Sequence, residues 1–405
     1  MRVLYSFPHK LGADRICYTA WQQILGLAGA GAEITLFTGA LRRPVPGTVD
    51  VHTTLSRGHL RIPYRVLGKM RALALHDRIV AHSLPRLTNR VDVVHLWPCA
   101  ALETIRAAKQ LGIRTVLERP NAHTRFCYEV VAAEHRRIGI RTPHPEYQRN
   151  EDVLAREEAE FEDTDFLLCP SRFVAESFLR AGFPPEKLLR HQYGFDEKLF
   201  YPSAERHDQT RKFTALFVGV DAVRKGLHFA LEAWLKSPAC ENGVFLIAGE
   251  LFDEFKQKFA SSLAHHSVVQ LGHRSDVPQL MRQADVLLMP SIEEGFALVC
   301  IEAIGSGCVP LVSTTCTDLC RHMENALVHP LGDVAMLSKQ LTELYSNRHL
   351  LSKLREGAIR SRGLWTWNAA GTALFRAYEQ AHSRPPRVIP GCTAACCRIA
   401  EPIRR

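Results

Sequence analysis

The sequence lacks the apolar segments that would carry it into or across a membrane. No uncharged apolar run approaches the roughly 20 residues that a membrane-spanning helix needs. The N-terminal stretch MRVLYSFPHKLGADR has no apolar core region and is not typical of a secretory signal. We therefore expect a cytoplasmic protein, either free or resting on the inner face of the cell membrane.

Disulfide and metal patterns are also absent. The 12 cysteines are spread from Cys17 to Cys397 without the spacing of a disulfide framework, so we expect reduced thiols, most of them small core residues. Cys316 and Cys320 lie near His322, but a structural zinc site needs about four ligands. No metal site is predicted.

Nucleic-acid motifs are missing, although the chain is basic. A net charge of +9 and a pI near 9.0 suit either nucleic acid or an anionic membrane as a partner. No zinc-finger, RNA-recognition or helix-turn-helix pattern occurs. We therefore expect no nucleic-acid partner.

Basic and apolar side chains alternate at helical spacing in residues 57–90. The basic residues are Arg57, Arg61, Arg65, Lys69, Arg71, Arg78, Arg86 and Arg90. Such a segment can lie on an anionic membrane surface, with its arginines on lipid phosphates. It can equally pack on its own domain and expose a solvated basic face, and the sequence leaves both readings open.

The length of 405 residues is too great for one ordinary core and predicts two domains of roughly 200 residues each. Residues 2–7, 16–27 and 33–37 have the patterns of a strand, a helix and a strand, which begin a doubly wound sheet. A further strand is predicted to start at residue 212, followed by a loop. The fold class is therefore α/β.

Residues 285–313, DVLLMPSIEEGFALVCIEAIGSGCVPLVS, carry the clearest functional pattern. They predict a buried strand over 286–289, a turn, a helix over 296–304 and a second strand over 309–312. A loop between a strand end and a helix N-terminus presents free N–H groups that bind anions, above all phosphate. Gly295 has no side chain, so a ligand could approach the backbone closely.

Two carboxylates in this stretch are spaced to face one ligand. Glu294 lies in the loop, and Glu302 lies about two turns into the helix. A carboxylate accepts two hydroxyl hydrogen bonds, which suits a sugar or ribose diol. The alternative is that Glu293 and Glu294 form a solvated turn and Glu302 is a surface residue, although the apolar neighbours of Glu302 make that less expected.

This stretch resembles the signature of the retaining GT-B glycosyltransferases of family 4, also called group 1. Their pattern is P-S-x-x-E-G-F-G-L-x-x-x-E-A-x-A-x-G-x-P-V-V; here Ala297 replaces a usual glycine and Gly305 a usual alanine. The resemblance implies that Glu302 binds the nucleotide ribose and that Glu294 lies against the donor sugar. It also implies that the backbone amides of three residues meet the sugar and diphosphate: Phe296, Ala297 and Leu298.

A second loop resembles the family pattern G-R-x-x-x-x-K-G, whose two cations neutralise the diphosphate. It runs GVDAVRKG from Gly219, so Lys225 matches the lysine, whereas Val220 stands where the arginine is usual. We expect Arg224 to supply the missing charge. The alternative is a solvated basic turn.

Three further candidates rest on position within the resemblance. Gly12 lies in the first loop, where relatives usually carry a Gly-rich turn near the diphosphate or the acceptor. His123 follows a predicted strand at a position comparable to a histidine beside the donor sugar, although a single histidine is more often structural. The loop over 272–277, which contains Arg274, would lie near the nucleotide base.

The resemblance covers roughly residues 1–382 and implies a GT-B fold, in which two doubly wound Rossmann-like domains face each other across a cleft. The segment HQYGFD from His191 resembles the family hinge. We therefore predict an acceptor-side domain over 1–192 and a nucleotide-sugar-binding domain over 193–366. A helix over 367–382 should return to the first domain, followed by a loose tail over 383–405.

The implied reaction moves a hexose-type sugar from a nucleoside diphosphate sugar to an acceptor hydroxyl with retention of configuration. Glu294, Lys225 and His123 would be catalytic, and no cofactor or metal is expected because no Asp-x-Asp pair stands at a strand end. The expected partners are the donor and a carbohydrate or lipid-linked acceptor, such as a membrane-associated glycolipid or polysaccharide precursor. Two alternatives remain: a nucleotide-sugar 2-epimerase, and a catalytically degenerate nucleotide-sugar-binding subunit.

Overall fold

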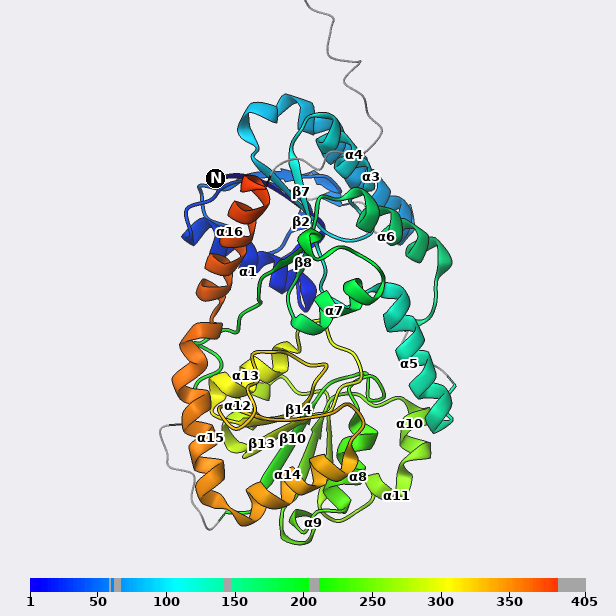
Figure 1. Ribbon diagram of the computed structural model, residues 1–405, viewed down its shortest axis with the longest axis vertical. Helices are drawn as coiled ribbons and strands as arrows, with labels where there is room; N and C mark the ends of the chain where they lie inside the picture. The colour runs from blue at the N-terminus through cyan, green and yellow to red at the C-terminus, as the bar shows by residue number, and fades with distance from the viewer. Residues whose placement is uncertain (58–59, 62–66, 142–146, 204–210, 385–405) are drawn as a thin grey trace, which may run out of the picture.

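The computed structural model describes residues 1–57, 60–61, 67–141, 147–203 and 211–384, which form two α/β domains (Figure 1). Each domain is built on a sheet whose paired strands are all parallel, as the alternation of strands and helices predicts. The two-domain, doubly wound architecture predicted from the sequence is confirmed.

The N-terminal sheet has the strand order β3-β2-β1-β6-β7-β8-β9. Its strands are β1 Arg2–Leu11, β2 Glu33–Leu41, β3 Asp50–Thr53, β6 Val93–Leu96, β7 Arg114–Glu118, β8 Phe166–Cys169 and β9 Leu188–Arg190; a hairpin of β4 Ser56–Arg57 and β5 Leu60–Arg61 stands apart. Its helices are α1 Ile16–Gly29, α3 Lys69–Ser83, α4 Leu102–Gln110, α5 Thr124–Ile138, α6 Glu151–Asp163 and α7 Arg172–Arg180, with 3-10 turns η1 Leu84–Arg86, η2 Thr88–Arg90 and η4 Pro185–Lys187. Strands β6 and β8 are buried along their whole length, as expected for strands covered on both faces.

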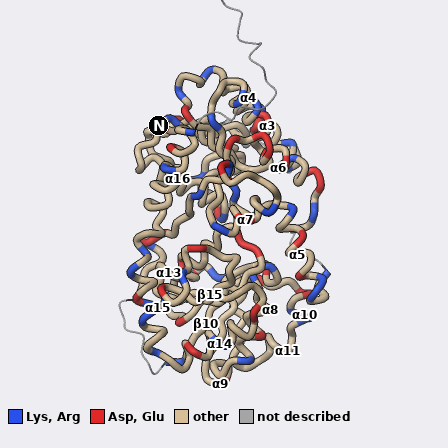
Figure 2. Tube along the Cα trace, in the orientation of Figure 1, with Lys and Arg blue, Asp and Glu red and all other residues tan. Residues whose placement is uncertain are grey.

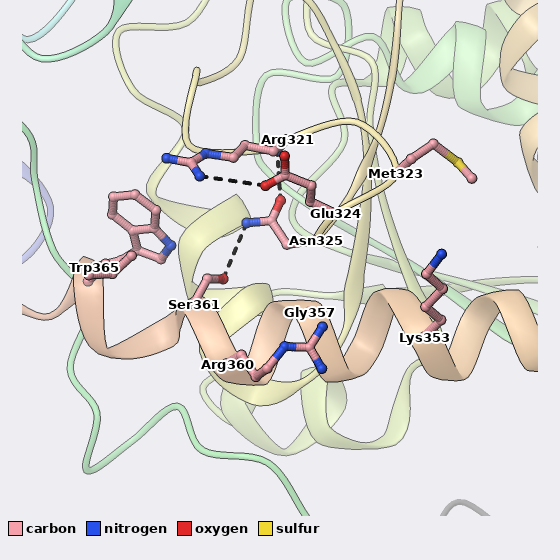
Figure 3. A pocket seen from close by; sticks show the side chains of 10 residues that line it. Arg321, Met323, Glu324, Asn325, Lys353, Gly357, Arg360, Ser361 and Trp365 are labelled. Carbon is pink, nitrogen blue, oxygen red and sulfur yellow. Dashed lines mark hydrogen bonds and ion pairs between the residues drawn. The ribbon is translucent and has the colours of Figure 1, made fainter.

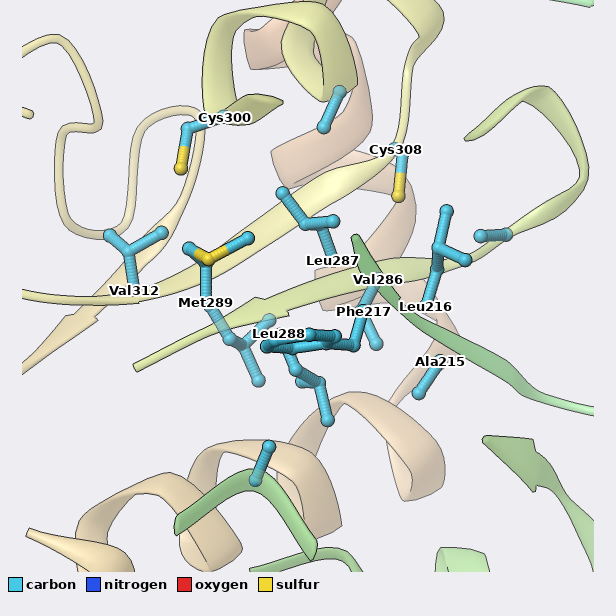
Figure 4. Packing of buried hydrophobic residues seen from close by; sticks show 14 of the residues in the cluster. Ala215, Leu216, Phe217, Val286, Leu287, Leu288, Met289, Cys300, Cys308 and Val312 are labelled. Atoms are coloured by element: carbon cyan, nitrogen blue, oxygen red, sulfur yellow. The ribbon is translucent and has the colours of Figure 1, made fainter. Parts of the chain in front are cut away.

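The C-terminal sheet has the order β12-β11-β10-β13-β14-β15. Its strands are β10 Thr214–Val218, β11 Val244–Ala248, β12 Val268–Gly272, β13 Val286–Met289, β14 Val309–Ser313 and β15 Leu327–His329. Its helices are α8 Leu227–Leu235, α9 Ala239–Asn242, α10 Asp253–Lys258, α11 Ala260–Leu263, α12 Val277–Gln283, α13 Leu298–Ser306, α14 Val334–Ser346 and α15 Arg348–Ser361, followed by the 3-10 turn η5 Arg362–Trp365. Figure 4 shows the core where β10 and β13 meet, with Leu287 and Met289 on the side of the sheet that faces Cys300 of α13, and Phe217 and Leu288 on the opposite side.

The last helix, α16 Trp367–Ser383, returns to the N-terminal domain and packs on α1. Gly26 and Gly371 allow this contact, because a Cβ on Gly26 would lie 2.7 Å from the Cα of Gly371. The chain therefore crosses between the domains twice. The crossings are joined to each other, since the Phe195 N–H donates to the Trp365 carbonyl oxygen at 3.0 Å.

Helix α5 is a third connection, which the sequence analysis did not predict. It begins in the N-terminal domain and ends against the C-terminal one (Figure 1). Ile138 and Ile140 join the C-terminal core, and Glu134 Oε1 lies 2.7 Å from Nε2 of His228 in α8. The two domains are thus in contact along α5 as well as at the crossings.

The basic segment over 57–90 is only partly described, since residues 58–59 and 62–66 lie outside the described residues. Helix α3 buries Leu73, Asp77 and Val80 against its own domain, whereas its arginines Arg71 and Arg78 are exposed. Asp77 accepts hydrogen bonds from the first backbone N–H groups of α4. In the parts of the chain that the structure describes, no helix is both long and apolar enough to cross a membrane.

Candidate donor site between the domains

The loop between β13 and α13 is buried and lies where the two domains meet, a region in which Figure 2 shows both acidic and basic residues. We call residues 290–297 the donor loop. Ala297, at its end, has φ 51° and ψ 62°, a left-handed conformation that explains why relatives usually have glycine there. Phe296 is buried against the ring of Tyr193, and Leu298 is the first residue of α13.

Glu294 lies at the centre of a charged cluster. Its Oε1 accepts hydrogen bonds from the Lys225 ammonium and from Ser291 Oγ at 3.0 Å, and its Oε2 lies 3.4 Å from Arg224 Nη1. Burial alone would raise the pKa of Glu294, but Lys225 and Arg224 outweigh that effect, so the pKa lies below its ordinary value. Glu294 is therefore ionised at neutral pH, and three predicted site residues are in contact.

The loop between β10 and α8, which carries both cations, packs directly on the donor loop. A Cβ on Gly226 would lie 2.0 Å from the Pro290 carbonyl oxygen, so only glycine fits this contact. The predicted residue Gly219 lies beside the Lys225 side chain, where a Cβ would be 3.2 Å from its Cγ. These glycines let the two loops approach closely enough for Lys225 to reach Glu294.

The Arg224 side chain is 12% exposed and lies among acceptors. Its Nη1 donates to the Glu293 carbonyl oxygen at 2.7 Å, and its guanidinium lies 4.9 Å from the ring centre of Tyr147. Its Nε lies 3.6 Å from Asp221 Oδ2, and neither atom has a hydrogen-bond partner among the residues that the structure describes. Burial lowers the pKa of Arg224, but the surrounding carboxylates more than reverse this and raise it well above its ordinary value.

Glu302 lies on α13 and is partly exposed. Among the described residues, its carboxylate makes no hydrogen bond or ion pair. Burial raises the pKa of Glu302 to about 7, although Lys225 partly opposes the effect. This carboxylate is therefore available for ligand hydroxyls and changes its charge near neutral pH.

Glu293 was not predicted as a site residue, and the alternative reading of a solvated turn is wrong. Its side chain is fully buried, and Glu294 is 5% exposed. The Glu293 carboxylate accepts hydrogen bonds from the N-terminal domain: the Ala122 N–H at 3.2 Å, the Cys127 thiol at 3.4 Å and the Tyr147 hydroxyl at 3.1 Å. No local sequence signal could reveal these partners, because they lie 146 to 171 residues away.

The expectation that a ligand approaches the backbone at Gly295 needs correction. A Cβ on Gly295 would lie 1.5 Å from the Pro120 carbonyl oxygen. The missing side chain therefore makes room for the N-terminal domain at this residue.

His123 packs as a structural histidine. Its ring lies against three phenylalanines, with centroid distances of 5.4 Å to Phe161, 5.2 Å to Phe178 and 6.1 Å to Phe183, and it is 5% exposed. Burial, assisted by Arg119, lowers its pKa to about 4. The predicted place beside the donor sugar is not supported by any of these contacts.

Gly12 and Arg274 have contacts outside the Glu294 cluster. Gly12 has φ +77°, and its carbonyl oxygen accepts a hydrogen bond from Arg43 Nε at 2.9 Å. Arg274 is exposed and pairs with Asp276, with Nε to Oδ1 at 2.8 Å. In the part of the chain covered by the structure, no group of three or more His, Cys, Asp or Glu side chains could hold a metal ion.

A separate hollow of about 390 Å³ lies beside α15 on the C-terminal domain (Figure 3). Its wall includes Arg321, Lys353, Arg360 and Trp365. Two of these cations are already paired with carboxylates, Arg321 with Glu324 and Arg360 with its own helix neighbour. The residues around this hollow do not include the Glu294 cluster.

Comparison with known proteins finds a family that part of the chain matches. Residues 212–347 match the model of the family described as glycosyl transferases group 1. Lipopolysaccharide glucosyltransferase WaaG of Escherichia coli K12 is 30% identical over 205 residues, 49% of this chain and 51% of that protein. A D-inositol 3-phosphate glycosyltransferase of Thermobispora bispora is 28% identical over 137 residues, 32% of each chain. The chain thus spans about half or less of the length of these curated relatives.

Solved structures share the whole two-domain arrangement. A sucrose-phosphate synthase from Thermosynechococcus elongatus has a TM-score of 0.66 at 18% identity, covering 94% of this chain and 99% of that one. WaaG has a TM-score of 0.63 at 17% identity, covering 93% and 98%. Anabaena HepE in complex with UDP-glucose has a TM-score of 0.63 at 15% identity, covering 94% and 100%. The chain therefore has the GT-B fold, and its residues 212–347, which include the donor loop, match the glycosyl transferases group 1 family.

Proposed function

We propose that the protein is a glycosyltransferase that transfers a hexose from a nucleoside diphosphate sugar to an acceptor hydroxyl, with retention of configuration. The observation that carries this proposal is the cluster of Glu294, Lys225 and Arg224 beside the free carboxylate of Glu302. Glu294, Glu302 and Lys225 stand at the donor-binding positions of the family signature, and Arg224 supplies the charge that is missing at Val220. The intact cluster also argues against a degenerate binding subunit.

The chemical difficulty of this reaction is charge, because a diphosphate leaves while positive charge develops on the sugar ring. Lys225 and Arg224 are fixed cations in a buried site, where they stabilise the leaving diphosphate more strongly than in water. In the unliganded structure Glu294 holds both cations. Donor binding therefore requires Lys225 to exchange part of its contact with Glu294 for a phosphate oxygen.

Retention of configuration follows a front-face route in this proposal. Glu294 accepts hydrogen bonds from the sugar hydroxyls and holds the ring, since its carboxylate is engaged with two cations and is a poor nucleophile. A phosphate oxygen of the donor then takes the proton of the acceptor hydroxyl as the new bond forms. The cations of this chain carry the charge of the leaving group without a metal ion.

The relatives and the surface of α3 support the acceptor and the membrane association in this proposal. WaaG is named for glucosyl transfer in lipopolysaccharide synthesis, and HepE was solved with UDP and with UDP-glucose. We therefore place a UDP-hexose first among donors and a carbohydrate or lipid-linked acceptor first among acceptors. The exposed Arg71 and Arg78 would rest on an anionic membrane surface on its cytoplasmic side.

The test is thermal unfolding in the presence of UDP, GDP, ADP and their common sugar conjugates. A ligand at 100 times its Kd stabilises the fold by about 2.7 kcal/mol, which a melting curve resolves. We expect one nucleotide to raise the Tm and Glu302→Ala to abolish that shift. Transfer of labelled sugar from the matching conjugate then establishes the activity. A protein that binds none of these ligands and transfers no sugar would contradict the proposal.

A further inference from the structure

One side chain of the donor loop, that of Glu293, is hydrogen-bonded to three groups of the N-terminal domain. Its three hydrogen-bond donors come from three separate segments: Ala122 from the loop after β7, Cys127 from α5, and Tyr147 from the segment before α6. The two carboxylate oxygens of Glu293 serve as the acceptors for all three donors. Because the side chain is fully buried, water does not compete for these bonds.

The same residue fixes one of the two cations of the donor site. The Glu293 carbonyl oxygen accepts the 2.7 Å hydrogen bond from Arg224, and its Oε2 lies 3.5 Å from the same Nη1. Tyr147 takes part in both interactions, since its hydroxyl binds Glu293 while its ring supports the Arg224 guanidinium. A residue of the N-terminal domain thus touches both the loop and the cation.

The backbone of the donor loop is also tightly packed against the N-terminal domain, two residues after Glu293. At Gly295 the N-terminal loop at Pro120 lies so close that a single added methyl group would overlap it. The donor loop and the N-terminal loop at Pro120 are therefore in direct backbone contact.

We propose that Glu293 is a positioning residue for sugar transfer, which ties the placement of Arg224 and Glu294 to the docking of the two domains. This inference rests on the proposed function. When the domains separate, Glu293 loses its three partners and Arg224 loses the ring beneath it. The cation that stabilises the leaving diphosphate is then correctly placed only in the docked state, in which water is excluded from the donor.

The experiment compares Glu293→Gln, Tyr147→Phe and the double variant with wild type. Tyr147→Phe removes only the hydroxyl and keeps the ring under Arg224. Glu232→Gln is the matched control, because Glu232 is exposed on α8 and its recorded ion pair is with Lys236. Each protein is assayed for the Kd of the nucleotide, the kcat of transfer, and the radius of gyration by small-angle scattering.

We expect kcat to fall about 10- to 100-fold in Glu293→Gln while the nucleotide Kd changes by less than about threefold, since misplacement affects the reacting geometry more than ground-state binding. The double variant should lose no more than about the larger single variant, because both act through one contact. The radius of gyration should increase in Glu293→Gln and stay unchanged in Glu232→Gln.

Unchanged kcat in Glu293→Gln, or losses that multiply in the double variant, would overturn the inference. A fall in nucleotide affinity equal to the fall in kcat would also overturn it, by making Glu293 a donor-binding residue. If Glu293→Gln does not fold, Tyr147→Phe alone tests the inference, which again requires a fall in kcat with little change in the nucleotide Kd. Failure of the proposed function would be distinct, because wild type itself would then bind no nucleotide, while the scattering comparison needs no substrate.

Discussion

At the scale of single residues, Glu302 links ligand binding to pH. Its pKa of about 7 means that roughly half of the carboxylates are protonated at neutral pH. Ribose hydroxyls donate hydrogen bonds to the ionised form, so binding favours loss of the proton. Affinity for the nucleotide should therefore rise with pH until the carboxylate is fully ionised.

We expect the nucleotide Kd to fall about tenfold between pH 6 and pH 8 in wild type, by titration calorimetry. Glu302→Gln should bind the nucleotide more weakly and should lack the part of the pH dependence that comes from Glu302. Any pH dependence that remains in this variant comes from other groups, including the nucleotide itself, and can be subtracted. A wild-type profile parallel to that of Glu302→Gln would show that Glu302 does not hold the ligand.

The sequence was informative at this scale where the pattern is local. Glu294 and Glu302 stand on one loop–helix unit, and their eight-residue spacing already places them near one ligand. Glu293 is the residue directly before Glu294 and is of the same type, yet the hydrogen-bond partners of Glu293 are distant in sequence. His123 shows the converse problem, because its aromatic cage is assembled from α6, α7 and the loop after α7.

At the scale of elements, α5 connects the domains through Glu134 and His228. Burial raises the pKa of Glu134, but hydrogen bonds from His228 and Arg137 more than compensate and lower it to about 2. A depressed carboxylate pKa stabilises the fold above the unfolded value near 4.5, and this contribution is lost as pH falls from there towards 2.

Glu134→Gln should lower the free energy of unfolding at pH 7 by about 1–2 kcal/mol, after allowance for partial exposure of the pair. The difference in the free energy of unfolding between wild type and the variant should be smaller at pH 4 than at pH 7. Urea unfolding at both pH values measures it. Lys236→Gln is the control, because Lys236 is exposed and follows the last residue of α8. An equal loss at both pH values would contradict the assignment of this effect to the ionised carboxylate.

Most elements were predictable because the strands are continuous apolar runs and the intervening helices are short. Helix α5 was missed for a physical reason. Its buried positions, Cys127, Tyr128, Val131, His135 and Ile138, have helical spacing, but they include polar residues and divide between two domains. The helical spacing of the buried residues was therefore visible in the sequence, but the polar residues among them hid the apolar face of the helix.

At the scale of the whole molecule, docking depends on the glycine in the donor loop. Gly295→Ala should force the two domains apart, because its methyl group cannot share space with the Pro120 carbonyl. We expect a larger radius of gyration and loss of most sugar transfer, with little change in circular dichroism. Gly363→Ala is the control, since nothing lies within 4 Å of a Cβ there. Unchanged scattering and activity in Gly295→Ala would mean that the loops repack without separating the domains.

The relative placement of the domains could not be read from the sequence, since it is determined by contacts between residues far apart in the chain. The resemblance supplied the architecture, whereas the chain-specific contacts of Glu293, Tyr147 and α5 appear only in the structure.

The hydrogen bond between Phe195 and Trp365 has a mechanical consequence. It joins the two chain crossings at one place. We therefore expect a hinge rotation of the two domains about that place and little sliding of one domain past the other. In Figure 1 the returning helices α15 and α16 run along one side of the molecule and α5 along the other. A small rotation therefore produces its largest displacement at the α5 side, where it breaks several contacts together.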